Sequence, residues 1–389
     1  IPVLDDFASF GVFAGDGNGD HSLFGGLDRR SRSRSFRSQS LLEIEVMSMS
    51  NEAHKKKPIE DKPEPLVSVR DLHTDFTVEG KTAQAVDGVS FDIMPGEVLG
   101  LVGESGCGKS VTALSLLKLI PDPPGKIRSG AAIYNGQDLL AMSYDEMRKI
   151  RGNEIAMIFQ EPMTALNPVF TIGFQMREAI QHHTGASKTE ANNQAVEMLE
   201  KVGLPDARAR LDNYPHQFSG GMRQRVMIAM ALSLHPALLI ADEPTTALDV
   251  TIQAQILDLM LNMKSQREGA SILLITHDLA VVAETCDRVV VMYGGKIQEV
   301  APVKELFRNP MHPYTRGLLR SLPRPELDSE QEELETIPGI VPSIFDWPPG
   351  CRFSTRCPLV EDRCRQEVPE LRDMGSGHWV RCHLAGEQA

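Results

Sequence analysis

A glycine-rich octapeptide, Gly103 to Ser110 (GESGCGKS), carries the clearest chemical signal in the chain. It fits the pattern G-x-x-x-x-G-K-[ST], and it follows an apolar run and precedes a helical pattern, which is the context that makes the match specific. Glycines let backbone N–H groups wrap around phosphates, and the start of a helix adds partial positive charge. We expect Lys109 to contact the β- and γ-phosphates of a nucleotide and the Ser110 hydroxyl to ligate Mg²⁺. A plain glycine-rich turn, the alternative, does not require Lys-Ser at this offset.

A pair of neighbouring carboxylates, Asp242 and Glu243, follows the apolar run from Leu238 to Ala241. Open α/β sheets bind ligands at the carboxyl ends of their strands, where these two side chains are expected. Asp242 is predicted to hold Mg²⁺, directly or through water, and Glu243 to act as the general base that polarises the attacking water. The alternative, an exposed acidic turn, is disfavoured by the phosphate-binding loop in the same chain.

Short strands and intervening helices must position these groups. The apolar run Val98 to Val102 predicts a strand before the phosphate-binding loop, and a helix is predicted from Ser110 to Ile120, where Pro121 to Gly125 stop it. Further strands are predicted at 155–159, 237–241 and 271–275, with helical stretches between them. Such βαβ units form a parallel sheet, so the fold class is α/β. Alternating apolar residues between Leu66 and Ile93 indicate additional strands.

A third motif, Phe218 to Arg225 (FSGGMRQR), opens a predicted helix that runs to about Leu234. It resembles the signature sequence of ATP-binding cassette (ABC) proteins, with Phe218 and Met222 in place of the commonest Leu and Gln. An exposed serine and two glycines at a helix start form an anion site. The resemblance implies that two cassettes dimerise head to tail, so that Ser219, Gly220 and Gly221 of one subunit reach the γ-phosphate bound to the other.

Other elements of the ABC family occur in the expected order. The resemblance implies that Gln160 senses Mg²⁺ and the membrane subunit, that Ala247-Leu248-Asp249 is the D-loop, and that His277 contacts the γ-phosphate. Phe76 falls where family members stack an aromatic ring on adenine. The resemblance also implies a P-loop cassette with a RecA-like core, an antiparallel β subdomain and an α-helical subdomain at about 162–235. The residues expected to contact ATP are Phe76, Gly103, Ser105, Gly106, Cys107, Gly108, Lys109, Ser110, Val111, Asp242, Ser219, Gly220, Gly221 and Asp249. The residues expected to take part in catalysis are Glu243, His277, Lys109 and Gln160. The residues expected to bind Mg²⁺ are Ser110, Gln160 and Asp242.

Two further segments narrow the resemblance. Phe159 to Pro168 (FQEPMTALNP) and Asn309 to Arg316 (NPMHPYTR) are similar to sequences of the ATP-binding subunits of dipeptide and oligopeptide permeases, whose relatives also import nickel. This likeness implies an importer ATPase at the cytoplasmic face of the cell membrane, paired with a second, similar ATPase (a homodimer is the alternative), two transmembrane permease subunits and, indirectly, an extracytoplasmic peptide-binding protein. A soluble, non-transport ABC ATPase and an ATPase gated by a redox-sensing cluster remain alternatives.

Four of the six cysteines gather near the C-terminus as Cys351, Cys357, Cys364 and Cys382, with the spacing C-x₅-C-x₆-C-x₁₇-C. Thiolates in a Pro-rich segment of weak hydrophobic patterning suggest a small module around a metal centre. The resemblance implies a [4Fe–4S] cluster, zinc is the second interpretation, and disulfides or free thiols are the third. Cys107 is interpreted as a small residue of the phosphate-binding loop.

The composition of the chain indicates the class of protein in which these motifs occur. The chain has 389 residues, a net charge of −13, 41% hydrophobic and 24% charged residues, which is typical of a globular protein. The acidic balance argues against a nucleic-acid partner, and no uncharged apolar run approaches the ~18 residues of a membrane-spanning helix. We predict an N-terminal tail at 1–64 with the native start at Met47 or Met49, an ABC domain at 65–305, and a C-terminal extension at 306–389 that carries the cysteines.

Overall fold

The computed structural model describes residues 64–161, 165–245, 249–322 and 336–386. These residues belong to one compact unit. The predicted tail and its start at Met47 or Met49 lie outside the described residues except for Glu64, and so do Ala247 and Leu248 of the predicted D-loop.

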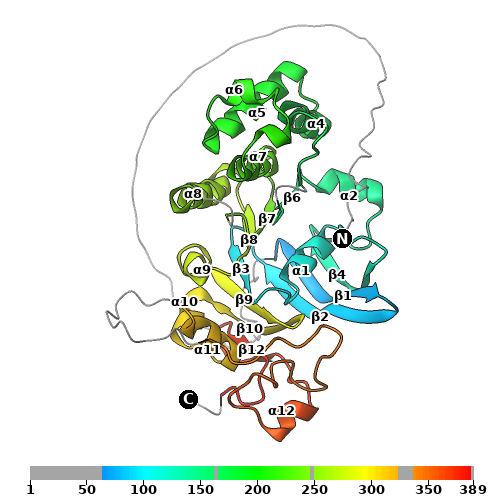
Figure 1. Cartoon of the computed structure of the whole chain (residues 1–389), viewed down its shortest axis with the longest axis vertical. Helices are drawn as coiled ribbons and strands as arrows, with labels where there is room; N and C mark the ends of the chain where they lie inside the picture. Colours follow the sequence, from blue (N-terminus) through cyan, green and yellow to red (C-terminus); the bar gives the residue numbers. More distant parts are fainter. Residues whose placement is uncertain (1–63, 162–164, 246–248, 323–335, 387–389) are drawn as a thin grey trace, which may run out of the picture. The chain divides into compact units, whose positions relative to one another are not determined.

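The larger of the two sheets in the described residues has eight strands and contains the predicted parallel core (Figure 1). Its strands run in the order β11-β12-β10-β9-β3-β8-β7-β6. The segment β9-β3-β8-β7-β6 is parallel, and β10 lies antiparallel to β9. The strands are β3 (Val98–Val102), β6 (Ile155–Ile158), β7 (Leu238–Asp242), β8 (Ser271–Ile275), β9 (Arg288–Tyr293), β10 (Lys296–Pro302), β11 (Arg372–Asp373) and β12 (Trp379–Val380).

A smaller antiparallel sheet has the strand order β2-β1-β4-β5. It consists of β1 (Val67–Val78), β2 (Lys81–Ile93), β4 (Gly125–Tyr134) and β5 (Gln137–Asp138). Its first two strands account for the alternating apolar residues between Leu66 and Ile93, because one face of each strand is buried while the other is partly exposed.

Helices connect the strands and cover the larger sheet. Their bounds are α1 (Lys109–Leu116), α2 (Tyr144–Ile150), α4 (Ile172–Thr184), α5 (Lys188–Lys201), α6 (Ala207–Arg210), α7 (Gly220–Leu232), α8 (Val250–Gln266), α9 (Leu279–Thr285), α10 (Val303–Arg308), α11 (Pro313–Arg320) and α12 (Asp362–Gln366), with a 3₁₀ turn at Pro215–Gln217. Ser143 and Ser187 begin α2 and α5 with capping boxes, each closed by a glutamate three residues on.

Both faces of the parallel strands are buried, as their uninterrupted apolar sequences predict. In β3, Val98 and Val102 contact the helical side of the core, whereas Leu99 and Leu101 face the core shared with β1, β2 and α1. Leu239 and Leu238 of β7 divide between the same two cores. The strand ends that carry the predicted site are therefore anchored from both sides.

The helix after the phosphate-binding loop is shorter than the predicted 110–120. It ends at Leu116 because Lys118 adopts a left-handed backbone conformation (φ 51°) and the N–H of Leu119 donates back to the carbonyl of Leu114 at 2.9 Å. Arg151 then donates to the free carbonyls of Leu117 and Lys118 at 2.9 and 3.0 Å. A long-range side chain thus satisfies carbonyls that a continued helix would have bonded.

The C-terminal residues continue the larger sheet. Trp379 and Val380 of β12 pair with Val300 and Glu299 of β10, and β11 pairs with β12. Two-residue strands have no sequence period, so the segment after Leu306 showed only a change of composition. The cysteine-bearing residues are joined to the cassette by main-chain hydrogen bonds.

Candidate nucleotide-binding site

The phosphate-binding loop lies between β3 and α1, as predicted, and close packing explains two of its glycines. Gly108 has a φ of 102°, and a Cβ atom there would lie 2.5 Å from the carbonyl oxygen of Ala85. At Gly103 (φ 149°) a Cβ atom would collide with the carbonyl of Met292. The loop therefore needs glycine at both positions to sit against β2 and β9.

Lys109 is held across the loop that it follows. Its side chain is buried, and Nζ donates to the carbonyl oxygens of Gly103 at 2.7 Å and Glu104 at 3.2 Å. These bonds hold the ammonium group against the backbone of the loop. A stationary cation there is what binding of β- and γ-phosphates requires.

Asp242 ends β7 and is 2% exposed. Burial raises the pKa of its carboxyl, and the charge of Glu243 adds to this, while a hydrogen bond from Ser110 and the charge of Lys109 lower it. Within the described residues, Oδ1 of Asp242 is buried without a hydrogen-bond partner. An orphaned carboxylate oxygen beside a serine hydroxyl is a donor set that Mg²⁺ prefers, so the residues fit this ion.

Glu243 follows Asp242 and is turned toward the neighbouring strand. Its N–H donates to the carbonyl of Ile275 at 2.9 Å, and its own backbone has a φ of 47°. His277, just beyond β8, places Nδ1 3.3 Å from Oε1 of Glu243, and the histidine side chain is 64% exposed. The structure thus brings together the predicted base and the predicted γ-phosphate ligand at one edge of the sheet, and left-handed backbone at a non-glycine residue is common at functional sites.

The signature residues lie at the start of α7. Ser219 caps this helix by accepting the N–H of Met222 at 3.3 Å, and Ser219 and Gly220 are exposed. Across the residues that the structure describes, no hydrogen bond joins Ser219 to the phosphate-binding loop.

The remaining predicted residues lie on other elements, and within the ranges that the structure describes no hydrogen bond or ion pair joins them to the phosphate-binding loop. Gln160 follows β6 and is exposed, and Asp249 precedes α8, where its carbonyl accepts the N–H of Gln253 at 2.8 Å. Phe76 is half-buried in β1, opposite Gly125 of β4. A Cβ atom on Gly125 would lie 2.8 Å from the Phe76 ring, so a glycine makes room for that ring.

Residues that were not predicted for the site also contact it. Glu104, the second residue of the phosphate-binding loop, is bound by Tyr314 and Arg356 from the C-terminal segment. Gln224 of α7 is buried and donates to the carbonyl of Pro244, next to Glu243. The loop pattern accepts any residue at position 104, so the sequence contained no signal for contacts that span 210 and 252 residues.

The four C-terminal cysteines, all within the described residues, are not arranged as the predicted metal site. Among the described residues, no group of three or more His, Cys, Asp or Glu side chains is arranged to hold a metal ion. Cys351 and Cys357 pack against the main core, whereas Cys382 packs in a small cluster with Val380 and Ala385. All four are free thiols, so disulfides are also absent from this part of the chain.

The four thiols nevertheless influence one another. Burial raises the pKa of Cys351 to about 12 and that of Cys357 to about 11, and in each case the charges of neighbouring C-terminal cysteines add to the shift. Burial and Cys364 likewise raise the pKa of Cys382. The raised pKa values keep Cys351, Cys357 and Cys382 protonated at neutral pH in the arrangement observed.

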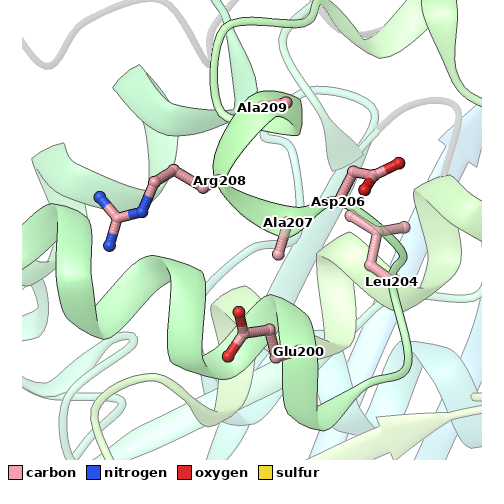
Figure 2. Close-up of a pocket in the computed structure, with 6 residues that line it drawn as sticks. All are labelled: Glu200, Leu204, Asp206, Ala207, Arg208 and Ala209. Carbon is pink, nitrogen blue, oxygen red and sulfur yellow. The ribbon is translucent and has the colours of Figure 1, made fainter.

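The pocket drawn in Figure 2 lies elsewhere, at α6 and the end of α5. Its lining residues are Glu200, Leu204, Asp206, Ala207, Arg208 and Ala209. None of these belongs to the predicted site, and both helices are remote in Figure 1 from the loop between β3 and α1.

In the part of the chain that is described, no helix is long and apolar enough to cross a membrane.

Comparison with known proteins agrees with this geometry. Residues 86–246 match the family model "ABC transporter", and residues 298–364 match "Oligopeptide/dipeptide transporter, C-terminal region". A probable peptide ABC transporter ATP-binding protein of Sinorhizobium fredii is 53% identical over 83% of this chain and 96% of its own length. The dipeptide transport ATP-binding protein DppD of Escherichia coli is 50% identical over 83% of this chain and 98% of its own.

Solved structures show the same fold. The ATP-binding cassette MJ0796, in a dimeric post-hydrolysis state bound to ADP and Pi, superimposes with a TM-score of 0.55 and 26% identity, and the match covers 61% of this chain and 98% of that one. The strand order, the phosphate-binding loop and the two family matches lead to one conclusion: the chain belongs to the family of ABC transporter ATP-binding proteins, in the group with an oligopeptide/dipeptide transporter C-terminal region.

Proposed function

We propose that this chain is the ATP-hydrolysing subunit of an ABC importer that takes up dipeptides or oligopeptides across the cytoplasmic membrane. The observation that carries the ATPase assignment is the convergence of Lys109, Asp242 and Glu243 at the carboxyl edge of the parallel strands. The peptide assignment is supported by relatives that are 50–53% identical, are matched over 96–98% of their own length and are named as peptide or dipeptide transport proteins.

In the proposed reaction the chain positions ATP and activates water. Lys109 binds the β- and γ-phosphates, and Ser110 and Asp242, with Gln160, would hold Mg²⁺, which would supply positive charge to offset that of the phosphate oxygens. Glu243 accepts a proton from the attacking water, and His277, which contacts Glu243 at 3.3 Å, orients toward the γ-phosphate. Phe76 stacks on adenine.

Hydrolysis is proposed to require two cassettes. Ser219, Gly220 and Gly221 are available at the start of α7, and no bond within the described residues ties Ser219 to the phosphate-binding loop. We infer that they complete the site of a second ABC ATPase, with Asp249 near the contact. A heterodimer with a similar subunit is favoured over a homodimer because of the resemblance to dipeptide permeases.

The helical part at about 162–235 is proposed to receive two transmembrane permease subunits, which in turn accept peptide from an extracytoplasmic binding protein. Its surface carries the exposed apolar side chains of Val169, Phe170, Phe174 and Tyr214. Exposed apolar patches on soluble domains are typical of protein contacts. We retain the domain division at 65–305 and 306–389 as a proposal, with the chain peripheral to the membrane.

We further propose a metal centre as a property of the loaded protein, with [4Fe–4S] first and zinc second. It is supported by the mutual electrostatic influence of Cys351, Cys357, Cys364 and Cys382, although these thiols must rearrange to ligate one ion. Anaerobically purified protein is expected to be brown with broad visible absorbance. Colourless protein without stoichiometric zinc would exclude both centres.

The direct test of the assembly is affinity purification of the tagged chain from native membranes. We expect two hydrophobic permease subunits and a second ABC ATPase to co-purify, and mass spectrometry identifies them. Recovery of the chain alone from membrane extracts, with its ATPase activity intact, would instead support a soluble non-transport ATPase.

A further inference from the structure

Glu104 places a carboxylate on a loop that is proposed to receive the highly charged phosphates of ATP. A like charge so close to an anion site weakens anion binding unless it is compensated. The compensation comes from outside the cassette motifs. Arg356, between Cys351 and Cys357, forms a bidentate ion pair with Glu104, with Nη1 to Oε2 at 2.6 Å and Nη2 to Oε1 at 3.1 Å.

The Arg356 side chain is buried and is held by hydrogen bonds to backbone carbonyls. Its side chain is 5% exposed, against 29% for Glu104. Nε donates to the carbonyl of Pro338 and Nη2 to that of Ile337, both at 3.1 Å. The Arg356 guanidinium group is therefore already held by the carbonyls of Ile337 and Pro338. Its ion pair with Glu104 costs less side-chain entropy than a flexible surface ion pair.

Tyr314 holds the backbone of the same loop residue. Its hydroxyl oxygen accepts the N–H of Glu104 at 2.8 Å, and the tyrosine is fully buried. The ring packs on Tyr293 and Phe353, with centroids 4.8 and 5.4 Å apart. Phe353 belongs to the same short segment as Arg356, so both contacts to the loop come from one packed body.

Three side chains therefore hold Glu104. Arg356 pairs with its carboxylate, Tyr314 accepts its N–H, and Lys109 donates to its carbonyl at 3.2 Å. We propose that Arg356 and Tyr314 are positioning residues for the phosphate-binding loop, which neutralise Glu104 and fix the loop in the conformation that binds ATP. The C-terminal segment thereby sets the nucleotide affinity of the cassette. This inference rests on the proposed nucleotide site.

The test compares the KM for ATP and the turnover of the assembled transporter that contains this chain with those of assemblies that contain its variants, because hydrolysis is proposed to require two cassettes. Arg356→Met removes the compensating charge and should raise the KM for ATP about tenfold while kcat stays within about twofold. Tyr314→Phe removes one hydroxyl and should raise KM by roughly threefold to tenfold. The control is Arg363→Ala, which breaks an exposed pair with Glu367 in the same segment and should leave both parameters unchanged.

A double variant separates charge compensation from general loosening of the fold. Adding Glu104→Gln to Arg356→Met removes the uncompensated carboxylate and should restore KM to within about threefold of the wild-type value. An unchanged KM in Arg356→Met, or no recovery in the double variant, would overturn the proposal. If Arg356→Met does not fold, Tyr314→Phe decides by the same measurement.

Failure of the nucleotide assignment itself would be distinguishable. In that case the wild-type chain would not bind ATP, and Lys109→Ala would change nothing. If the wild-type chain binds ATP and Lys109→Ala weakens binding, only the positioning role of the C-terminal segment is at issue in the comparisons above.

Discussion

At the scale of single residues, the account depends on two adjacent carboxylates in different surroundings. Asp242 is buried beside Ser110 with one oxygen unpartnered, whereas Glu243 lies at the strand edge beside an exposed histidine. The buried group is suited to a metal ion and the edge group to proton transfer with water. Each role gives a distinct expected phenotype.

Glu243→Gln should retain ATP binding and reduce hydrolysis by about 100-fold or more, because the amide cannot accept the proton of the attacking water. Nucleotide binding and phosphate release are measured separately on the same preparation. Hydrolysis near the wild-type rate would refute the assignment of Glu243 as general base.

Asp242→Asn should raise the melting temperature of the nucleotide-free chain by roughly 2 °C and abolish the stabilisation given by Mg²⁺ with ATP. Burial raises the pKa of Asp242, so ionisation costs the folded state more than the unfolded state. The gain from asparagine should therefore grow as the pH rises through the folded-state pKa of Asp242. The control is Asp258→Asn, which replaces an exposed carboxylate on α8. An equal rise in melting temperature in this variant would contradict the argument that burial of Asp242 causes the effect.

At the scale of elements, β10, α11 and β12 are joined by a buried polar cluster. Glu299 accepts the N–H groups of Met311 and His312 at 2.7 and 3.0 Å, and it lies 2.7 Å from Nε2 of His378. Burial raises the pKa of Glu299, but hydrogen bonds, first that of His378, outweigh this and lower it. The cluster keeps α11, and with it Tyr314, in place.

The same cluster predicts acid lability. Burial lowers the pKa of His312 to about 4, with Arg381 and Arg316 adding to the shift and Glu299 opposing it. The unfolded chain binds this proton near pH 6.5, so stability should fall by on the order of 3 kcal/mol as the pH drops from 7 to 4. His312→Asn keeps an acceptor at the start of α11 and should flatten the dependence of melting temperature on pH. A slope unchanged in this variant would show that other groups control the loss.

The sequence predicted the elements best where apolar runs lie in the parallel core. The strand at 271–275 has the predicted bounds, and the loop from Gly103 to Ser110 lies between a strand and a helix as expected. The helix at 110–120 was predicted too long because Arg151, distant in sequence, bonds the carbonyls at its end. The Arg356 contact with Glu104 and the pairing of β12 with β10 were also missed, since neither leaves a local pattern.

At the scale of the whole molecule, the cassette and the C-terminal segment share one sheet and one site. The C-terminal segment, whose cysteines are proposed to hold a metal centre, also contacts the phosphate-binding loop and extends the sheet through β12. A metal ion or other ligand bound to that segment would therefore change the affinity of the cassette for ATP. We propose that the exposed signature residues contact a second cassette.

The most direct measurement of the central claim is ATP-dependent uptake of a labelled dipeptide into proteoliposomes that contain the assembled transporter and its binding protein. We predict accumulation with Mg²⁺ and ATP for the wild-type chain and loss of accumulation with Lys109→Ala, which removes a phosphate contact of roughly 1.5–3 kcal/mol. Accumulation without ATP, or equal accumulation with Lys109→Ala, would contradict the account.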